Sequence, residues 1–233
     1  MSSAKLRGFA ICTSPRTGSN FVCQLISSTG VLGKPLEYFN WRGRRHFENA
    51  GYPDHVAGQI NEILSTGCTD NSIYALKLFA HQHDWISGEI AWTKVLPNLS
   101  FVYLTRNDLV AQAISWAIAL QTGQFRATQT AHGEPVFDAI LINQQLRQII
   151  IENARWTFYF ARTGIAPLHL IYEDVLADPE GAVEKIAALM GLSPTPIPVV
   201  KAVNVSVQRT MMNEAWATRF RGEYGDPDVL LQF

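Results

Sequence analysis

The stretch GFAICTSPRTGSNFVCQLISS, residues 8–28, decides the fold of this chain. Its first part, Gly8–Thr13, is a short apolar run bounded by turn residues, which is typical of a strand buried on both faces. A loop with the sequence SPRTG follows at residues 14–18. The apolar spacing of Ser19–Ser28 then indicates a helix that stops before Gly30. The stretch therefore predicts a strand, a glycine-bearing loop and a helix in succession.

Elsewhere in the chain, short apolar runs alternate with helical patterns. Further strands are expected at Ser72–Phe79, Leu99–Thr105 and Leu168–Tyr172. Helical patterns cover about Asp54–Leu64, His83–Trp92, Leu109–Gln121, Phe137–Arg162 and Pro179–Met190. This alternation predicts an α/β fold of three layers, with a parallel sheet flanked by helices. We expect one domain over residues 1–233, and the order of the strands stays open.

The composition is that of an ordinary globular enzyme. The chain has 233 residues, of which 47% are hydrophobic and 17% charged, and its formal net charge is −1. This balance argues against a protein that binds nucleic acid or anionic membranes, so any anion site must be local. The apolar N-terminal run fits a first strand better than a signal peptide, and no stretch reaches the length of a membrane-spanning helix. We therefore expect a cytoplasmic protein without an integral membrane segment.

The loop at residues 14–18 has the properties of an anion cradle. A loop that leaves a parallel strand and opens a helix directs backbone N–H groups and the helix N-terminus at one point, which attracts phosphate. Gly18 permits close approach of the backbone, and Arg16 supplies positive charge. Hydroxyl groups are offered by Ser14, Thr17 and Ser19. The Lys of the pattern GxxxxGK[ST] is missing, and a well-capped turn without a ligand is the alternative.

A second candidate anion contact follows the strand Leu99–Thr105. Arg106 lies at the carboxyl end of that strand, where open α/β sheets bind ligands. Ser115 comes nine residues later on a predicted helix, so both side chains reach one phosphate only if the loop between them folds back. The alternative is a structural Arg106 that pairs with Asp108.

Together these two elements resemble the sulfotransferase superfamily, whose phosphosulfate loop carries Lys or Arg before Ser/Thr-Gly-Ser/Thr. Here that pattern is Arg16-Thr17-Gly18-Ser19, and the family's strand-end Arg and helical Ser match Arg106 and Ser115. More narrowly, the chain resembles the bacterial trehalose 2-sulfotransferase family over nearly its whole length. The segments that carry this resemblance are SPRTGSNFVCQLISSTGVLGKPLEYF, ALKLF, TRNDLVAQAISW and VQRTMMNEAWATRF.

The resemblance implies a P-loop-like sulfotransferase fold and the donor 3'-phosphoadenosine 5'-phosphosulfate (PAPS), which leaves as PAP. The 5'-phosphosulfate would be held by Arg16, Thr17, Gly18, Ser19 and Asn20. The 3'-phosphate would be held by Arg106 and Ser115. A polar tail over about residues 199–233 would close over the nucleotide, with Gln208 and Arg209 near the 3'-phosphate. The resemblance also implies a homodimer and an acceptor hydroxyl on a carbohydrate or glycolipid, and the chemistry requires no metal.

Two charged residues are candidates for the transfer step. Lys77 lies in an apolar strand, where an unpaired buried Lys is costly, and the resemblance directs it at the transferring sulfonyl group. The alternative is a strand-end Lys that reaches solvent. Glu37 is flanked by apolar and aromatic residues in PLEYF, which favours a raised pKa and greater basicity. In the related family a Glu in this motif deprotonates the sugar hydroxyl, and Arg16 would stabilise the leaving oxygen.

Other residues are weaker candidates. His81 and His83 follow the strand Lys and are the second choice of base, although a loop histidine is the more common explanation. Two stretches, Trp41–Pro53 and Thr122–Pro135, are expected to be long loops that contact the acceptor. Within them the aromatic or basic side chains that suit a sugar are Trp41, Phe125 and Arg126.

Two other functions compete with sulfonate transfer. A P-loop phosphotransferase that uses ATP or GTP would need a Lys in the loop and a strand-end Asp for Mg²⁺, and neither is present in the sequence. A catalytically silent nucleotide-binding protein would keep the anion loops. Such a protein has no use for Glu37 and Lys77, because PAP binding requires neither.

Overall fold

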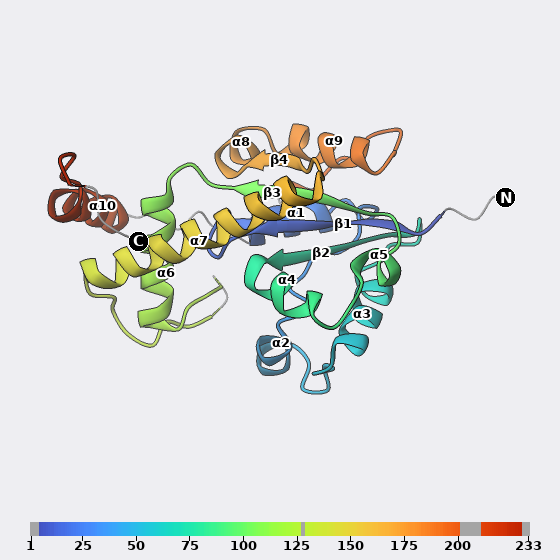
Figure 1. Ribbon diagram of the computed structural model, residues 1–233, viewed down its shortest axis with the longest axis horizontal. Helices are drawn as coiled ribbons and strands as arrows, with labels where there is room; N and C mark the ends of the chain where they lie inside the picture. Colours follow the sequence, from blue (N-terminus) through green and yellow to red (C-terminus); the bar gives the residue numbers. More distant parts are fainter. Residues whose placement is uncertain (1–4, 127–128, 201–210, 230–233) are drawn as a thin grey trace.

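The computed structural model describes residues 5–126, 129–200 and 211–229. Its centre is a sheet of four parallel strands in the order β2-β1-β3-β4 (Figure 1). The strands are β1 (Arg7–Thr13), β2 (Ile73–Phe79), β3 (Leu99–Thr105) and β4 (Leu168–Ile171). All four were predicted within one residue at each end, whereas their order was left open. Because β2 and β3 lie on opposite sides of β1, the crossover from β1 to β2 and the crossover from β2 to β3 run in opposite directions across the sheet.

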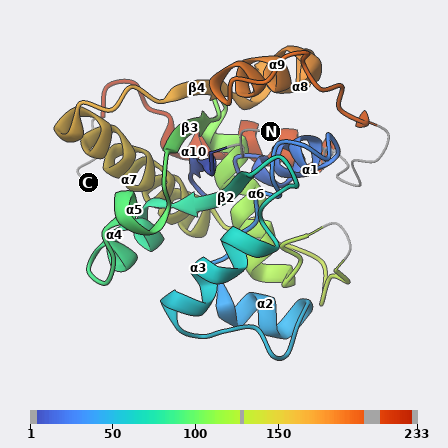
Figure 2. The ribbon, with the colours of Figure 1, turned by 90° about the vertical axis from the view of Figure 1, so that its right-hand side faces the viewer.

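Helices cover both faces of the sheet, so the predicted three-layer α/β class is confirmed (Figure 2). One face packs against α1 (Ser19–Ser27), α8 (Tyr172–Ala177) and α9 (Pro179–Leu189). The other packs against α3 (Val56–Ser65), α4 (Ala80–Ser87), α5 (Trp92–Val95) and α7 (Ala139–Thr163). The residues of β1 alternate between these faces: Phe9 and Ile11 face α1, while Ala10 and Cys12 face the other layer.

A third apolar cluster places two further helices beyond the carboxyl edge of the sheet. Helix α6 (Leu109–Thr122) packs against α7, and α10 (Met211–Tyr224) packs on both through Trp216 and Phe220 (Figure 1). The segment 199–233 was expected to be a polar tail, yet its residues 211–224 form this helix. The two buried aromatic side chains explain the difference, because they give α10 an apolar contact with the rest of the fold.

The expected loop Trp41–Pro53 is a second difference. Its first half forms helix α2 (Trp41–Phe47), which begins where the Asn40 side chain accepts a hydrogen bond from the Gly43 N–H group (3.2 Å). This cap stabilises a short helix that has no apolar repeat of its own. The other expected loop begins at Thr122, the last residue of α6, and its remaining described residues form no helix or strand. None of the described helices is long and apolar enough to cross a membrane.

Candidate active site

A cavity of about 920 Å³ opens at the carboxyl edge of the sheet. It is lined by parts of the β1–α1 loop, α1, the stretch 35–48, the ends of β2 and β3, α6 and α10, together with Phe125, Arg126 and Gln129. The candidate site residues that line it are Arg16, Gly18, Ser19, Asn20, Glu37, Lys77, Arg106 and Ser115. The structure thus brings together residues that are up to about a hundred positions apart in the sequence.

The β1–α1 loop folds tightly around Gly18, which has a φ of 90°. A Cβ atom on this glycine would lie 2.1 Å from the ring of Tyr172, which follows β4. Helix α1 begins at the next residue, Ser19, so its first N–H groups have no partner within the helix and end at this loop. The loop therefore has the close backbone approach and the helix N-terminus that an anion cradle needs.

Two of the three predicted hydroxyl donors are engaged inside the protein. The Thr17 hydroxyl donates to the Ser14 carbonyl (2.7 Å) and lies 2.6 Å from the Thr13 hydroxyl. Ser14 is buried, and its hydroxyl accepts a hydrogen bond from the Gln112 side chain (3.0 Å), which also donates to the Pro15 carbonyl (2.6 Å). Both hydroxyls thus help to hold the loop in shape, and the contact of Thr17 with the donor stays a prediction. Among the three, only Ser19 lines the cavity.

Gln112 is a site residue that the sequence analysis missed. It lies on α6, is fully buried, and holds the β1–α1 loop through the two hydrogen bonds just described. The feature of the sequence that could have identified Gln112 is a long polar side chain between apolar neighbours on the buried side of a helix. That signal predicts a buried partner but gives no indication of which loop contains it.

The structure brings Arg16 together with Arg106 and Ser115, although the sequence analysis assigned Arg16 to the 5'-phosphosulfate and the other two to the 3'-phosphate. The Arg16 guanidinium donates to the Ser115 hydroxyl (3.1 Å) and to the Phe125 carbonyl (2.6 Å). Arg106 donates to the Arg16 carbonyl (3.4 Å), and its guanidinium lies over the Tyr172 ring. Burial and the nearby Arg106 charge both lower the pKa of Arg16, and Glu37 partly opposes them. Two guanidinium groups that repel each other in a cavity favour an anion as ligand.

Lys77 and Glu37 form a buried ion pair beside this loop. Lys77 is only 4% exposed, and its Nζ atom lies 2.5 Å from Glu37 Oε1 and 2.7 Å from Asn20 Oδ1. Its side chain points to the α1 side of the sheet because it follows Ile73 and Ala75 in the alternation of β2. The backbone N–H group of Lys77 also donates to the backbone carbonyl of Leu36 (2.9 Å). This bond fixes the neighbouring Glu37 beside Lys77. The alternative of a Lys that reaches solvent is wrong.

The pKa of Glu37 differs in direction from the prediction. Burial raises the pKa of this carboxyl, as the sequence indicated, but the Lys77 charge and hydrogen bonds from Lys77 and Asn40 together outweigh it. The Asn40 bond to Glu37 Oε2 is 3.0 Å long. The net result is a pKa below the ordinary value of 4.5. Glu37 is therefore held as a carboxylate, and its position matters more than an enhanced basicity.

A sequence model of a known family matches nearly the whole chain. The match is to the Stf0 sulphotransferase family and covers residues 8–223. The chain belongs to the Stf0 sulphotransferase family. It is therefore an enzyme, as the resemblance implied, and the cavity beside the loop Arg16-Thr17-Gly18-Ser19 is its candidate active site.

Curated relatives of this sulfotransferase extend over similar lengths. It is 23% identical to the trehalose 2-sulfotransferase of Mycobacterium tuberculosis, with 95% of this chain and 97% of the relative covered. It is 22% identical to the trehalose 2-sulfotransferase of Mycolicibacterium smegmatis, with coverages of 91% and 94%.

Solved sulfotransferase structures are more distant. One from Alicyclobacillus acidocaldarius has 14% identity and a TM-score of 0.46, and the alignment covers 94% of this chain and 92% of that one. The sulfotransferase domain of the curacin biosynthetic pathway has 11% identity and a TM-score of 0.47, with coverages of 95% and 98%.

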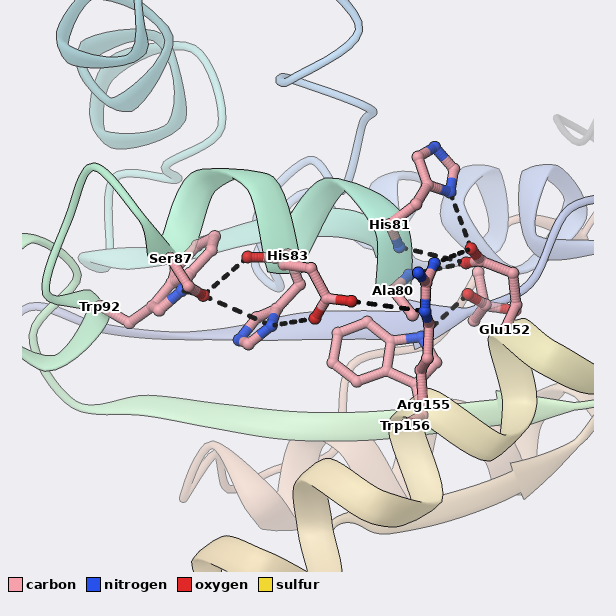
Figure 3. A network of polar contacts seen from close by, with 10 residues as sticks. Ala80, His81, His83, Ser87, Trp92, Glu152, Arg155 and Trp156 are labelled. Carbon is pink, nitrogen blue, oxygen red and sulfur yellow. Dashed lines mark hydrogen bonds and ion pairs between the residues drawn. The ribbon is translucent and has the colours of Figure 1, made fainter.

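Neither histidine of the second-choice pair lines the cavity of the sulfotransferase. His83 is buried among aromatic rings, stacked on Trp92 at 5.2 Å, and burial lowers its pKa (Figure 3). His81 contacts the buried carboxylate of Glu152 (3.0 Å), which also accepts a hydrogen bond from the Ala80 N–H group (2.9 Å). Figure 3 shows both histidines in a network between α4 and α7. The structure therefore leaves Glu37 as the candidate base.

Two of the three side chains that were expected to contact the acceptor line the cavity. Phe125 and Arg126 line it, whereas Trp41 does not and instead lies under Arg42 and Arg45, at 5.2 and 5.3 Å from its ring centroid. Three further lining residues, Arg44, Phe47 and Glu48, were missed because this stretch was expected to be a loop. Gln208 and Arg209 lie outside the described residues. The C-terminal helix α10 contributes Asn213, Glu214, Ala217, Thr218 and Arg221 to the lining of the cavity.

Gly18→Ala should destabilise the sulfotransferase and abolish its stabilisation by PAP. The methyl group needs the space of the Tyr172 ring, and a φ of 90° is strained for alanine, so we expect a loss above about 2 kcal/mol. Gly30→Ala is the matched control, because Gly30 also has a positive φ (69°) but nothing within 4 Å of the new Cβ atom. Denaturant unfolding of both variants measures the difference, and equal losses would contradict the close contact with Tyr172.

The rate of the sulfotransferase should be insensitive to mild acid. As the candidate base, Glu37 would act when ionised, and because its pKa is lowered from 4.5 it stays ionised as the pH falls from about 8 to about 5. We expect kcat/KM for the donor, which reports the free enzyme, to stay flat over this range and to fall only at lower pH. An acid limb with its midpoint near pH 6 that disappears in Glu37→Gln would mean that the pKa is raised instead.

Proposed function

We propose that this sulfotransferase transfers the sulfonate group of PAPS to a hydroxyl of a carbohydrate or glycolipid acceptor. The observation that carries the proposal is one cavity with two parts: the Arg16 and Arg106 guanidinium groups at the β1–α1 loop, and the Lys77–Glu37 ion pair beside them. The first part suits a ligand with several anionic groups. The second suits proton and sulfonyl transfer. The carbohydrate acceptor is supported by the two curated relatives, both named trehalose 2-sulfotransferase.

The described residues fit such a donor. Gly18 leaves backbone space at the N-terminus of α1, and Arg16 and Arg106 provide two fixed positive charges around it. Arg106 and Ser115, the proposed 3'-phosphate contacts, both reach the Arg16 loop. Gln208 and Arg209 are proposed to join them from the C-terminal segment that closes over the nucleotide, next to α10.

When bound, PAPS supplies an activated sulfonyl group whose bond to the bridging phosphate oxygen breaks as the acceptor oxygen bonds to sulfur. Arg16 is placed to neutralise the charge left on that phosphate oxygen, with help from the first N–H groups of α1. Lys77 is placed to hold the sulfonyl oxygens, and Glu37 to take the proton of the attacking hydroxyl. None of these steps requires a metal ion.

In this mechanism the Lys77–Glu37 ion pair links binding of the donor to the basicity of Glu37. In the structure Lys77 lies against Glu37 and Asn20, and it is the main cause that lowers the pKa of Glu37. A sulfonyl group beside Lys77 competes for the same ammonium. Glu37 then loses part of its ion pair and becomes a stronger base at the time when a donor is present.

The two competing functions fit the site less well. A P-loop phosphotransferase uses a loop Lys, and the cation of this loop is Arg16. A silent PAP-binding protein would not need the buried Lys77–Glu37 pair, whose desolvation is costly.

Transfer of radiolabelled sulfonate from PAPS to a panel of sugars and glycolipids tests the proposal. We expect label on at least one carbohydrate acceptor in the presence of EDTA. Label transfer from γ-labelled ATP or GTP, with none from PAPS, would contradict it and favour the phosphotransferase.

We also propose that the sulfotransferase is a homodimer. The resemblance to the trehalose 2-sulfotransferase family supports this, and so does a group of apolar side chains around the start of α7 that includes Val136 and Ile140, 72% and 64% exposed. Exposed apolar side chains of this size suit burial against a second copy. A monomer by light scattering at micromolar concentration would overturn the dimer.

A further inference from the structure

Asn40 lies beside the candidate base and contacts it twice. It lines the cavity, and its side-chain Nδ2 atom donates a hydrogen bond to Glu37 Oε2 (3.0 Å). Its backbone N–H group donates to the Glu37 carbonyl (3.1 Å). One hydrogen bond from the backbone and one from the side chain thus join the same two residues and close the turn that carries Glu37. The turn therefore holds the carboxylate in one orientation.

The amide of Asn40 has a second partner. Its Oδ1 atom accepts a hydrogen bond from the Gly43 N–H group (3.2 Å) and so caps the N-terminus of α2. The two contacts fix the orientation of the amide, because a backbone N–H group must meet the oxygen and a carboxylate must meet the nitrogen. A cap alone is served about equally well by Asn, Asp or Ser. The contact with Glu37 requires a donor as well, and of these three side chains only Asn carries a donor and an acceptor on separate atoms.

The two carboxylate oxygens of Glu37 differ in their partners. Oε1 lies 2.5 Å from the Lys77 ammonium group, whereas Oε2 accepts from the uncharged Asn40 amide. An oxygen against an ammonium group is the weaker proton acceptor, and Oε2 has a second lone pair beyond the one that Asn40 occupies. The Glu37 side chain lines the cavity and is 21% exposed, so an acceptor hydroxyl can approach it. The proton of that hydroxyl is therefore best accepted by Oε2.

We propose that Asn40 is a positioning residue for the transfer step and presents Glu37 Oε2 to the acceptor hydroxyl as the oxygen that takes the proton. In this step the acceptor O–H bond breaks, the proton goes to Oε2, and the acceptor oxygen bonds to sulfur. The bond from sulfur to the bridging phosphate oxygen breaks, and its electron pair stays on that oxygen of PAP. This inference rests on the proposed role of Glu37 as the base and adds the residue that orients it.

The titration of Glu37 reports its contact with Asn40. The other charged or titratable groups that face the carboxylate come from β2, the β1–α1 loop, the loop after α6 and α1, and they are Lys77, Arg16, Arg126 and Cys23. The first three are cations in acid, and Cys23 is a neutral thiol because burial raises its pKa to about 12. The hydrogen bond from Asn40 is one of the causes that lower the pKa of Glu37, so its loss should raise that pKa.

NMR titration of the Glu carboxyl carbons in the enzyme alone tests this contact without any substrate. The variant is Asn40→Ser, which keeps a capping oxygen but is too short to place a donor where the Nδ2 atom lies. The Glu37 resonance is identified by its absence in Glu37→Gln, and we expect its midpoint at higher pH in Asn40→Ser than in the wild-type enzyme. Asn40→Asp also keeps the cap and should raise the midpoint further, because two adjacent carboxylates hold a proton between them.

The matched control is Asp178→Ser, which changes the cap of α9 outside the cavity. It should leave the Glu37 midpoint unchanged. Melting temperatures of all variants show whether each is folded, and the midpoint in Asn40→Asp provides the decision if Asn40→Ser is not.

Rates of sulfonate transfer from PAPS, with the acceptor identified by the radiolabel assay, test the consequence for catalysis. We expect Asn40→Ser to lower kcat about tenfold although Glu37 becomes a stronger base, because a base that is held less accurately is less often placed to take the proton. The KM for PAPS should stay within about twofold. In the Glu37→Gln background the same change should alter kcat by less than about twofold, because no proton acceptor is left to position.

Three results would overturn the inference: an unchanged Glu37 midpoint in both Asn40 variants, an unchanged kcat in Asn40→Ser, or a tenfold loss that persists in the Glu37→Gln background. The last result would mean that Asn40 acts only through the cap of α2. Failure of PAPS to label any acceptor would overturn the proposed function and the proton transfer with it. The Glu37 midpoint would then still show separately whether Asn40 holds the carboxylate.

Discussion

Glu37→Gln should lower kcat about a thousandfold and leave the affinity for PAP within about twofold. The amide keeps the size of the side chain and can still contact Lys77 and Asn40, which lie 2.5 and 3.0 Å from the two carboxylate oxygens. It has no capacity to take a proton from the acceptor hydroxyl. The affinity for PAP should change little, because PAP lacks the sulfonyl group, which is the part of PAPS proposed to lie next to Glu37.

The control for this variant is Glu184→Gln, an exposed position on α9 outside the cavity. Steady-state rates with a saturating acceptor and melting temperatures with PAP separate the two effects. A variant that turns over at the wild-type rate would remove Glu37 from the mechanism. A variant that also loses the PAP effect would show that Glu37 shapes the donor site instead of acting as the base.

Lys77→Met should remove activity and also lower the free energy of unfolding by about 2 kcal/mol at pH 7. The loss of one member of a fully buried ion pair costs about 3–5 kcal/mol, and we expect less here because the Glu37 side chain keeps 21% exposure. The remaining carboxylate keeps its hydrogen bond from Asn40 but loses the cation that lies against it. Denaturant unfolding at pH 7 measures the loss.

Two comparisons separate the contribution of the Lys77–Glu37 ion pair from that of Lys77 packing. Without Lys77, burial should raise the pKa of Glu37, so the carboxyl becomes neutral as the pH falls and the stability loss shrinks between pH 7 and pH 4. The double variant Glu37→Gln/Lys77→Met should recover much of the stability at pH 7 but none of the activity. A loss that is the same at both pH values, with no recovery in the double variant, would mean that Lys77 stabilises the fold by packing alone.

Much of the fold could be predicted from the sequence because its signals are local. The four strands are apolar runs between turn residues, and the long helices α6 and α7 have clear apolar faces. Helix α2 was missed because WRGRRHF has no apolar repeat and depends on the Asn40 cap and the Arg44 contacts. The order of the strands follows from helix packing, which short motifs do not specify.

In the candidate site, too, residues with a local sequence signal were predicted and residues that depend on contacts between elements were not. The motif residues Arg16, Gly18 and Arg106 were identified because the chemistry of anion binding fixes their types and their places at strand ends. The partners Gln112 and Glu48 were missed, since each reaches its contact from another element. The low pKa of Glu37 was predicted in the wrong direction, because the sequence did not show that Lys77 lies against it.

We expect the cavity to bind the PAPS nucleotide through Arg16 and Arg106 without a metal ion. Thermal stabilisation by PAP, compared with ATP and GTP and each measured with and without Mg²⁺, tests it most directly. We expect a rise in melting temperature with PAP that is independent of Mg²⁺ and is lost in Arg106→Ala. A rise with ATP or GTP that requires Mg²⁺, with none from PAP, would show instead that the protein is a phosphotransferase.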